Sequence, residues 1–216
     1  AQMVTQEGGN VSVCAVEGNF DDAQTGVKQI FTAFQGKELP FLLSSANSIN
    51  IGRLAPQIMY YFRCYADLLN RKVIALGDPV DFCVPTGNFG DILAGYFAKK
   101  LGLPVGRLIC ASNANNVLTE FLTTGIYDRR RPLHKTTSPS MDILVSSNLE
   151  RLLYLLSGDQ ALVASLMEDL SQKGYYQVPE ELLGAIQKEF GAGCCDDETA
   201  KETIGKVYKA QGYLMD

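Results

Sequence analysis

The stretch DFCVPTGNFGDILAGYFAKKLG, residues 81–102, decides the fold. It opens with a short β-rich run, and the residues after Asp91 have helical periodicity. Lys99 and Lys100 lie in the last turn of that helix, where cations suit the negative end of the helix dipole, and Gly102 stops it. A strand that passes through a glycine-containing turn directly into a helix is typical of a βα unit in a parallel sheet.

The same pattern recurs at two other places, because the β-rich runs Val11–Val16 and Gly106–Ala111 are each followed by helical periodicity. This alternation predicts an α/β fold, a three-layer αβα arrangement with a mainly parallel sheet, from residue 11 to about residue 125.

Beyond Ser146 the pattern is helical and acidic, with no strong strand expected. The expected helices cover 148–157, 159–172, 179–190 and 196–212. We therefore expect an α/β core at residues 1–155 and a helical C-terminal region at residues 156–216.

A helix is also expected at about residues 23–34, because Asp21 or Asp22 can cap its start and Gly36 can stop it. Residues 127–142 have no clean period and are expected to form a long loop that begins with a solvated arginine run.

Residues 54–70 are apolar on nearly every side, which predicts a helix buried between layers. Pro56 fits only near the first turn of a helix, so this one is expected to begin close to Arg53, with Asn50 in the loop before it.

Composition excludes several classes of protein. The chain has 216 residues, a formal net charge of −5, 46% hydrophobic residues and 20% charged residues, which excludes wholesale disorder. The acidic balance argues against a nucleic-acid partner. No stretch reaches the ~18 consecutive apolar residues of a membrane helix, and the first residues show no signal peptide. We therefore expect a cytoplasmic protein, and its oligomeric state stays open.

The cysteine pattern indicates reduced thiols and no metal site, since there is no CxxC motif and the chain has one histidine. Cys14, Cys83 and Cys110 lie inside apolar runs, where cysteine behaves as a small hydrophobic residue. The adjacent pair Cys194 and Cys195 is interpreted as two unpaired thiols in a loop, with a redox element as the alternative.

The turn at residues 85–91, PTGNFGD, is the sharpest chemical feature of the chain. Two glycines three residues apart let backbone amides converge, and the helix N-terminus adds partial positive charge. The turn can therefore cradle an anion, most often a phosphate, although a plain tight βα turn is the alternative. It is neither a dinucleotide fingerprint nor a P-loop, and Asp91 places a negative charge beside the expected anion.

Two more segments carry polar groups that can bind an oxyanion or a polar substrate. The amides, hydroxyl and guanidinium of NSINIGR, residues 47–53, can chelate an oxyanion, with an ordinary turn before a helix as the alternative. The hydroxyl-rich residues 137–142 and 147–151 can hold a polar substrate or cap the next helix.

Nucleophilic catalysis finds little support. His134 is the only imidazole and lies in the basic loop, and none of the eleven lysines lies in an apolar setting at a strand end.

Four motifs together resemble threonine synthase. They are VEGNFDDAQ (16–24), NSINIGR (47–53), VPTGNFGDILAGYFAKKLGLP (84–104) and SPSMDI with SNLER (138–151), in the order of that family. The resemblance covers most of residues 3–155. It implies a pyridoxal-phosphate enzyme of the tryptophan-synthase-β fold type that converts O-phospho-L-homoserine and water to L-threonine and phosphate.

The resemblance also assigns roles to residues. It implies that Gly87, Asn88, Phe89 and Gly90, with Asp91 at the edge, hold the phosphate of pyridoxal phosphate. It implies that Asn47, Ser48 and Arg53 bind the phosphate of the substrate. The alternatives are another pyridoxal-phosphate enzyme of the same fold type, such as a dehydratase or a cysteine synthase, and a non-catalytic phosphate-binding module.

One departure from the family matters for activity. In the family the Schiff-base lysine lies upstream of the VEGNFDDA segment, and the residues that precede this segment here contain no lysine. The family's chain also continues beyond the last residues of this one. We therefore expect a central fragment of threonine synthase, truncated at both ends, that holds no catalytic lysine and is inactive alone.

Overall fold

The computed structural model describes residues 7–18, 20–48 and 50–215. They fall into two compact units, one up to Leu43 and one from Ser44 onward. The sheet and the three polar motifs expected to bind phosphate belong to the second unit, so the functional argument concerns that unit.

In the first unit, helix α2 covers Phe20–Phe34, and Gly36 follows it with a φ of 75°. The helix begins earlier than predicted, with Asp21 and Asp22 in its first turn. The predicted strand at 11–16 is wrong. Among the described residues, the segment pairs only through an isolated bridge between Gly8 and Val11. An alternating apolar pattern cannot form a strand without a neighbouring strand to bond its backbone N–H and C=O groups.

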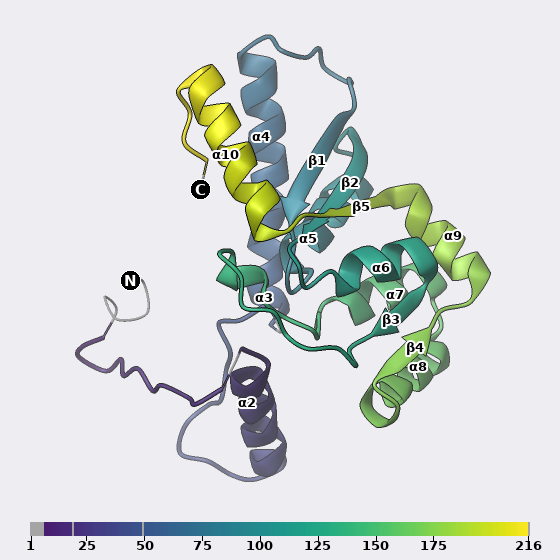
Figure 1. Cartoon of the computed structure of the whole chain (residues 1–216). Coiled ribbons are helices and arrows are strands. Elements are labelled where there is room, and N and C mark those ends of the chain that lie inside the picture. Colours follow the sequence, from purple (N-terminus) through teal and green to yellow (C-terminus); the bar gives the residue numbers. More distant parts are fainter. Residues whose placement is uncertain (1–6, 19, 49, 216) are drawn as a thin grey trace. The chain divides into compact units, whose positions relative to one another are not determined.

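The second unit is built on a parallel sheet with the strand order β1-β2-β5 (Figure 1). These strands are β1 (Val80–Pro85), β2 (Val105–Ser112) and β5 (Phe190–Cys194). The predicted α/β class and the two predicted strands at 81–84 and 106–111 are confirmed. The expectation that the C-terminal third has no strand is wrong, because β5 pairs with β2 in parallel.

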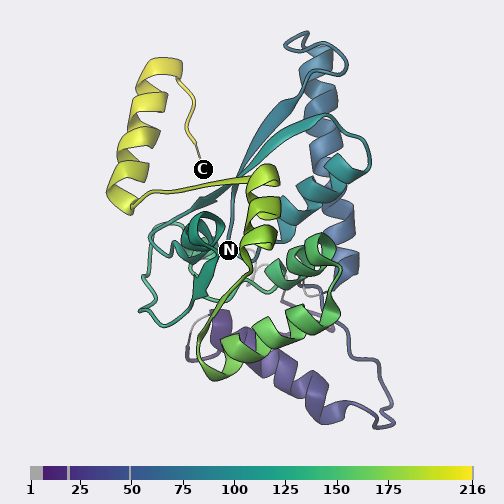
Figure 2. The ribbon, with the colours of Figure 1, turned by 90° about the vertical axis from the view of Figure 1, so that its right-hand side faces the viewer.

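Helices α4 (Ile58–Asn70) and α5 (Gly90–Lys100) pack together, and α5 also contacts β1 and β2 (Figure 2). The sheet face that they cover carries Phe82, Leu108 and Phe190, which are aligned across the three strands. On the other face the side chains of Asp81, Cys83 and Arg107 are exposed. The core of the unit therefore lies between α5 and the covered face, with Leu108 fully buried.

Residues 54–70 are helical, as predicted, but the helix is not buried on every side. The segment forms α3 (Ile51–Leu54), a 3-10 turn η1 (Ala55–Gln57) and α4. Asn50 lies directly before α3, as expected, and its side chain caps that helix. In α4, Tyr61 and Tyr65 are buried, whereas Met59 is 71% exposed.

The remaining helices of the second unit follow the sheet strands in sequence. They are α6 (Val117–Thr124), α7 (Leu149–Ser157), α8 (Gln160–Gln172), α9 (Glu180–Glu189) and α10 (Asp197–Gln211). The four beyond Ser146 lie within one residue of their predicted bounds. Among the described residues, no helix is both long enough and apolar enough to cross a bilayer.

A second, two-stranded antiparallel sheet joins the expected loop to the helical region. It consists of β3 (Ile126–Asp128) and β4 (Tyr175–Gln177), which the sequence did not predict. The rings of Tyr127 and Tyr176 stack across it with centroids 5.2 Å apart. A short 3-10 turn, η2 (Pro139–Met141), lies near the end of the long loop.

The cysteines differ in environment. Cys110 is buried, and burial raises the pKa of its thiol to about 11, so it acts as the small hydrophobic residue that was predicted. Cys14 and Cys83 are exposed, contrary to that prediction. Cys194 and Cys195 are exposed at the end of β5.

Helix α5 packs tightly against α4 and the sheet at Gly95. A Cβ at this position would lie 2.6 Å from the Tyr61 ring and 2.9 Å from a Leu108 methyl group. Gly95→Ala should therefore destabilise the chain by about 1 kcal/mol in urea unfolding, because overpacking outweighs the gain in helix propensity.

Gly205→Ala in α10 is the matched control, since a Cβ there has no atom within 4 Å. It should stabilise the chain by about 0.5–1 kcal/mol. Equal stabilisation by both substitutions would contradict the packing that we describe for Gly95.

Candidate functional site

Three polar segments meet at the carboxyl end of β1, although they are far apart in the sequence. They are residues 45–50, residues 86–90, and residues 146–151. Each belongs to a different motif singled out from the sequence. Hydrogen bonds between side chains and backbone groups join all three segments.

The Asn88 side chain links the loop at residues 86–90 to both other segments. Its Oδ1 accepts hydrogen bonds from the backbone N of Ser147 at 2.9 Å and from its hydroxyl at 2.8 Å. Its Nδ2 donates to Ser48 Oγ at 3.3 Å. The Asn88 side chain therefore fixes the loop, and any anion at this turn would meet its backbone.

The backbone carbonyls of the loop face residues 146–148. Gly87 O accepts a hydrogen bond from Ser146 Oγ at 2.9 Å, and Asn88 O accepts one from Asn148 Nδ2 at 2.8 Å. In a planar trans peptide, the C=O and the next N–H point in opposite directions. The N–H groups of Asn88 and Phe89 therefore point away from residues 146–148.

The loop then turns into α5 through Phe89, whose φ of 60° is in the left-handed region. Phe89 is buried, and its ring packs against Phe190 of β5 at 5.5 Å. Such a φ is costly for a bulky residue, so this packing and the bond from Leu93 N to Phe89 O must hold it.

Amide donors without a protein acceptor collect at this turn. Across the described residues, no hydrogen bond is donated by the backbone amides of residues 87–92. The amides of the first turn of α5 have no acceptor within the helix, and they lie at the positive end of its dipole. The chemistry and direction of these donors fit the phosphate group of a ligand.

Gly87 and Gly90 are required by close packing rather than by an unusual φ. A Cβ on Gly87 would lie 2.9 Å from Ser140 O, and a Cβ on Gly90 would lie 3.1 Å from Ser48 Cβ. Neither glycine has a positive φ. A larger residue would thus push the neighbouring segments away from the loop.

The NSINIGR segment divides into structural and exposed residues. Asn50 Oδ1 accepts from Gly52 N at 2.9 Å, which caps α3, and its Nδ2 donates to Ser45 O at 3.0 Å. Arg53 is in α3 with its side chain exposed. Ile49 lies outside the described residues.

The Ser48 hydroxyl is occupied by protein partners. It donates to Asn47 Oδ1 at 3.2 Å and accepts from Asn148 at 2.9 Å and from Asn88 at 3.3 Å. A hydroxyl has one donor and two acceptor positions, so all three are used. Ser48 therefore joins the segments, and its direct contact with an anion would need Asn47 to move.

Desolvation raises the pKa of the Asp91 carboxyl in the first turn of α5, and a hydrogen bond with Tyr61 opposes this shift. The Tyr61 hydroxyl donates to the backbone O of Asp91 at 2.8 Å, and burial raises the pKa of that phenol. The start of α5 is thus tied to α4.

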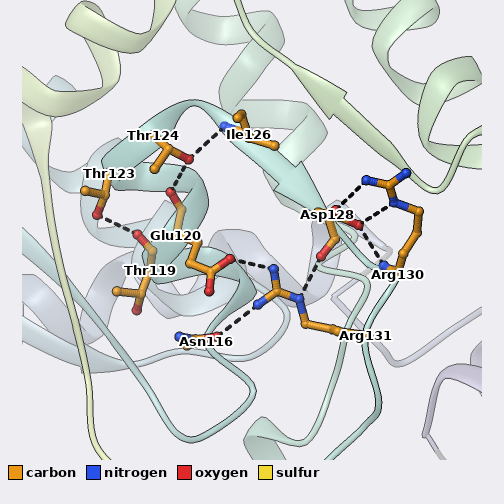
Figure 3. A network of polar contacts seen from close by, with 9 residues as sticks. All are labelled: Asn116, Thr119, Glu120, Thr123, Thr124, Ile126, Asp128, Arg130 and Arg131. Carbon is orange, nitrogen blue, oxygen red and sulfur yellow. Dashed lines mark hydrogen bonds and ion pairs between the residues drawn. The ribbon is translucent and has the colours of Figure 1, made fainter.

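Arg129 and Arg130 are exposed, as predicted for a solvated loop, but Arg130 and Arg131 also form ion pairs (Figure 3). Arg131 donates to the Asn116 side chain at 3.0 Å and forms an ion pair with Glu120 of α6. Arg130 holds both carboxylate oxygens of Asp128 and lies 4.0 Å from the Tyr175 ring.

The hydrogen bonds of this network lower the pKa of the Glu120 carboxyl, and those from Arg130 lower the pKa of Asp128 to about 2. Both groups are therefore ionised at neutral pH. The network anchors the beginning of the loop at residues 129–142.

A second cluster anchors the end of that loop to the end of β2. Asp142 Oδ1 accepts from Asn113 Nδ2 at 2.7 Å and from Asn115 Nδ2 at 3.1 Å, and both asparagines are buried. Thr136 donates its N and its hydroxyl to Asp142 at 2.9 and 2.8 Å. Because Ser140 lies against Gly87, this cluster helps to place the residues that pack against the turn at residues 86–90.

Sequence reasoning missed part of the site. It interpreted the hydroxyls of 147–151 as substrate ligands or helix caps, but those of Ser146 and Ser147 bind the loop at 86–90. The run of asparagines directly after β2 was the available signal for the Asp142 cluster, since it follows a parallel strand at its carboxyl end. The His134 side chain is exposed and only its backbone joins that cluster.

Comparison with known proteins shows extensive similarity. The chain is 44% identical over its whole length to threonine synthase-like 1 of Homo sapiens and 44% identical to threonine synthase of Pseudomonas aeruginosa. It superposes on the crystal structure of pyridoxal-phosphate-bound threonine synthase from Brucella melitensis with a TM-score of 0.79, 45% identity and 93% of this chain covered. With yeast threonine synthase the TM-score is 0.80, at 38% identity and 94% coverage. No protein-family profile matches the chain.

The chain is homologous to one part of threonine synthases. It spans 30% of the length of the human relative and 45% of the Pseudomonas threonine synthase. It covers 42% of the Brucella threonine synthase chain and 41% of the yeast one. The resemblance inferred from the four motifs is thereby confirmed.

Removing the Asp142 carboxylate should destabilise the chain strongly. Asp142→Ala removes the carboxylate that accepts hydrogen bonds from Asn113, Asn115 and Thr136, and one hydrogen bond to a charged group contributes about 1.5–3 kcal/mol. We expect a loss of about 2–3 kcal/mol in urea unfolding.

Asp169→Ala is the control, because Asp169 forms a solvent-exposed i,i+4 ion pair with Lys173. Its loss should be below about 0.5 kcal/mol. If both aspartate variants lost the same small amount, Asp142 would not anchor the loop.

Proposed function

We propose that the chain is the phosphate-binding part of a pyridoxal-phosphate-dependent threonine synthase, which converts O-phospho-L-homoserine and water to L-threonine and phosphate. The observation that carries this proposal is the set of amides at residues 87–92, which have no protein acceptor among the described residues. The N–H groups of Asn88 and Phe89 among them point away from residues 146–148. The similarity to threonine synthases over the whole chain supports it.

In this proposal, the loop of Gly87, Asn88, Phe89 and Gly90, with Asp91 at its edge, binds the cofactor phosphate through backbone N–H groups. Asn88 orients that loop through its side chain, and the buried Phe89 holds the turn. When bound, pyridoxal phosphate supplies an electron sink for carbanion chemistry. The threonine synthase of Brucella melitensis, one of the relatives compared above, binds the same cofactor in its crystal structure.

The substrate phosphate is assigned to Asn47, Ser48 and Arg53. Arg53 is exposed, so its guanidinium can reach a ligand, and its planar fork suits a phosphate. Ser48 contributes by holding the segment against the cofactor loop. A phosphorylated substrate accounts for this arginine, whereas a dehydratase or a cysteine synthase would not need it. The acidic net charge of −5 and the cysteine pattern fit a cytoplasmic enzyme that acts on small molecules.

The phosphate-binding turn can be tested directly with pyridoxine 5′-phosphate. This compound carries the phosphate but has no aldehyde, so it cannot form imines with surface lysines. Titration into the ¹⁵N-labelled chain should shift the amide resonances of residues 88–92. Pyridoxine without phosphate should leave them unchanged. If the compound shifts other helix N-termini and leaves residues 88–92 unchanged, the proposed cofactor-phosphate site is wrong.

Two variants should separate the anion sites in the same titration. Gly90→Val should weaken the binding of pyridoxine 5′-phosphate about ten-fold or more, where ten-fold equals ~1.4 kcal/mol. Its side chain also meets Ser48, so the binding of O-phospho-L-homoserine should weaken too. Arg53→Ala should weaken only the binding of O-phospho-L-homoserine. Loss of pyridoxine 5′-phosphate binding in Arg53→Ala, with normal binding in Gly90→Val, would reverse the assignment.

The 216 residues alone should release no phosphate from O-phospho-L-homoserine in the presence of pyridoxal phosphate. None of the eleven lysines occupies the position that the family gives to the Schiff-base lysine, and without that bond the cofactor cannot act as an electron sink. A phosphate-release assay on the purified chain measures this. Turnover that copurifies with the chain and exceeds the protein-free rate would show that one of its lysines acts as the Schiff-base lysine.

A further inference from the structure

Asn148 occupies the N-cap position of α7 without capping the helix. Asparagine is among the preferred N-cap residues because its side chain usually accepts a hydrogen bond from the first turn. Here the side chain is fully buried and turns away from that role. Its hydrogen bonds go instead to segments 60 and 100 residues away in the sequence.

Both N–H groups of the Asn148 amide are used by the proposed phosphate-binding segments. One donates to Asn88 O at 2.8 Å and the other to Ser48 Oγ at 2.9 Å. The backbone N of Asn148 also donates to Asn88 O, at 3.3 Å. A single residue thus holds the peptide between Asn88 and Phe89 and the hydroxyl that joins the substrate segment.

Arg151 determines which way the Asn148 amide faces. Its Nη1 donates to Asn148 Oδ1 and, at 2.8 Å, to the backbone O of Ser48. An oxygen that accepts from a guanidinium cannot be exchanged with the amide nitrogen without placing two donors face to face. Arg151 thereby directs the two N–H groups of Asn148 toward Asn88 and Ser48.

We propose that Asn148 and Arg151 are positioning residues that preset the phosphate-binding turn and couple it to the substrate segment. This proposal rests on the proposed function of the turn. Neither residue needs to touch the ligand. Asn148 holds the carbonyl of Asn88, and peptide planarity then directs the N–H of Phe89 toward the anion. Without Asn148, the peptide between Asn88 and Phe89 can rotate. Its carbonyl oxygen would then face the phosphate and repel that anion.

The same bonds connect the two proposed anion sites. Ser48 lies beside Gly90, and Asn148 contacts Ser48 and Asn88 together. The substrate segment therefore cannot shift without disturbing a group that orients the cofactor loop. Asn148 should for this reason affect the binding of both phosphates, whereas Arg53 affects one.

The test compares the wild-type chain with Asn148→Ala and Arg151→Met in ¹⁵N titrations with pyridoxine 5′-phosphate and with inorganic phosphate. Asn148→Ala should weaken both about five- to ten-fold, the range that loss of one hydrogen bond produces. Arg151→Met keeps the apolar stem and removes the guanidinium, so it should weaken both ligands by a smaller factor, about two- to five-fold.

The control for a variant that is merely less stable is Val105→Ala, which removes buried apolar volume at the amino end of β2, at the opposite end of the sheet from the turn, and should leave both affinities unchanged. A double-mutant cycle adds a readout that destabilisation alone does not move. Ser48→Ala should weaken phosphate binding less in Asn148→Ala than in the wild-type chain, because the hydrogen bond between Asn148 and Ser48 is lost in both single variants.

Each result decides between the proposals. If the wild-type chain binds both ligands and the affinity is unchanged in Asn148→Ala and in Arg151→Met, the positioning role is overturned and the phosphate site stays in place. If Asn148→Ala does not fold, unchanged affinity in Arg151→Met has the same meaning. Absence of any shift at residues 88–92 in the wild-type chain overturns the phosphate site and, with it, the positioning role.

Discussion

The site depends on the direction of two peptide bonds. A turn can present its N–H groups to an anion only if its carbonyls point the other way, and buried carbonyls need donors of their own. Gly87 and Asn88 receive those donors from Ser146 and Asn148. The glycine-containing turn is therefore half of the site, and a segment about 60 residues later supplies the other half.

The rest of the second unit serves to bring those halves together. The β1–α5 unit fixes the turn on one side through the close contact of Gly95 with α4 and β2. The loop at 129–142 delivers the other side, because ion pairs on α6 hold its beginning and Asp142 holds its end. Buried hydrogen bonds of this kind are costly to leave unpaired, so the loop has few alternative positions.

Local sequence patterns predicted the elements whose causes are local. Strands β1 and β2, helix α5 and the C-terminal helices have the required periodicity, caps and stops. Residues 11–16 alternate as well as β1 does, but strand formation needs a neighbour that the pattern cannot reveal. The opposite error occurred at β5, where FGAGC has weak strand propensity and Phe190 is held by β2, Phe89 and Tyr96.

The same distinction explains the site residues. The glycine spacing of the turn was a local signal, and it drew attention to a turn whose amides have no acceptor among the described residues. The residues at 147–151 were interpreted as holding a polar substrate or capping the next helix, because capping is the common role of polar residues at a helix start. Asn148 lies at that start. Its real partners, Asn88 and Ser48, become visible only when the three segments are folded together. A polar residue that leaves its common local role unused, and is nevertheless fully buried, must be satisfied by something distant, and here that distant partner is the turn at residues 86–90.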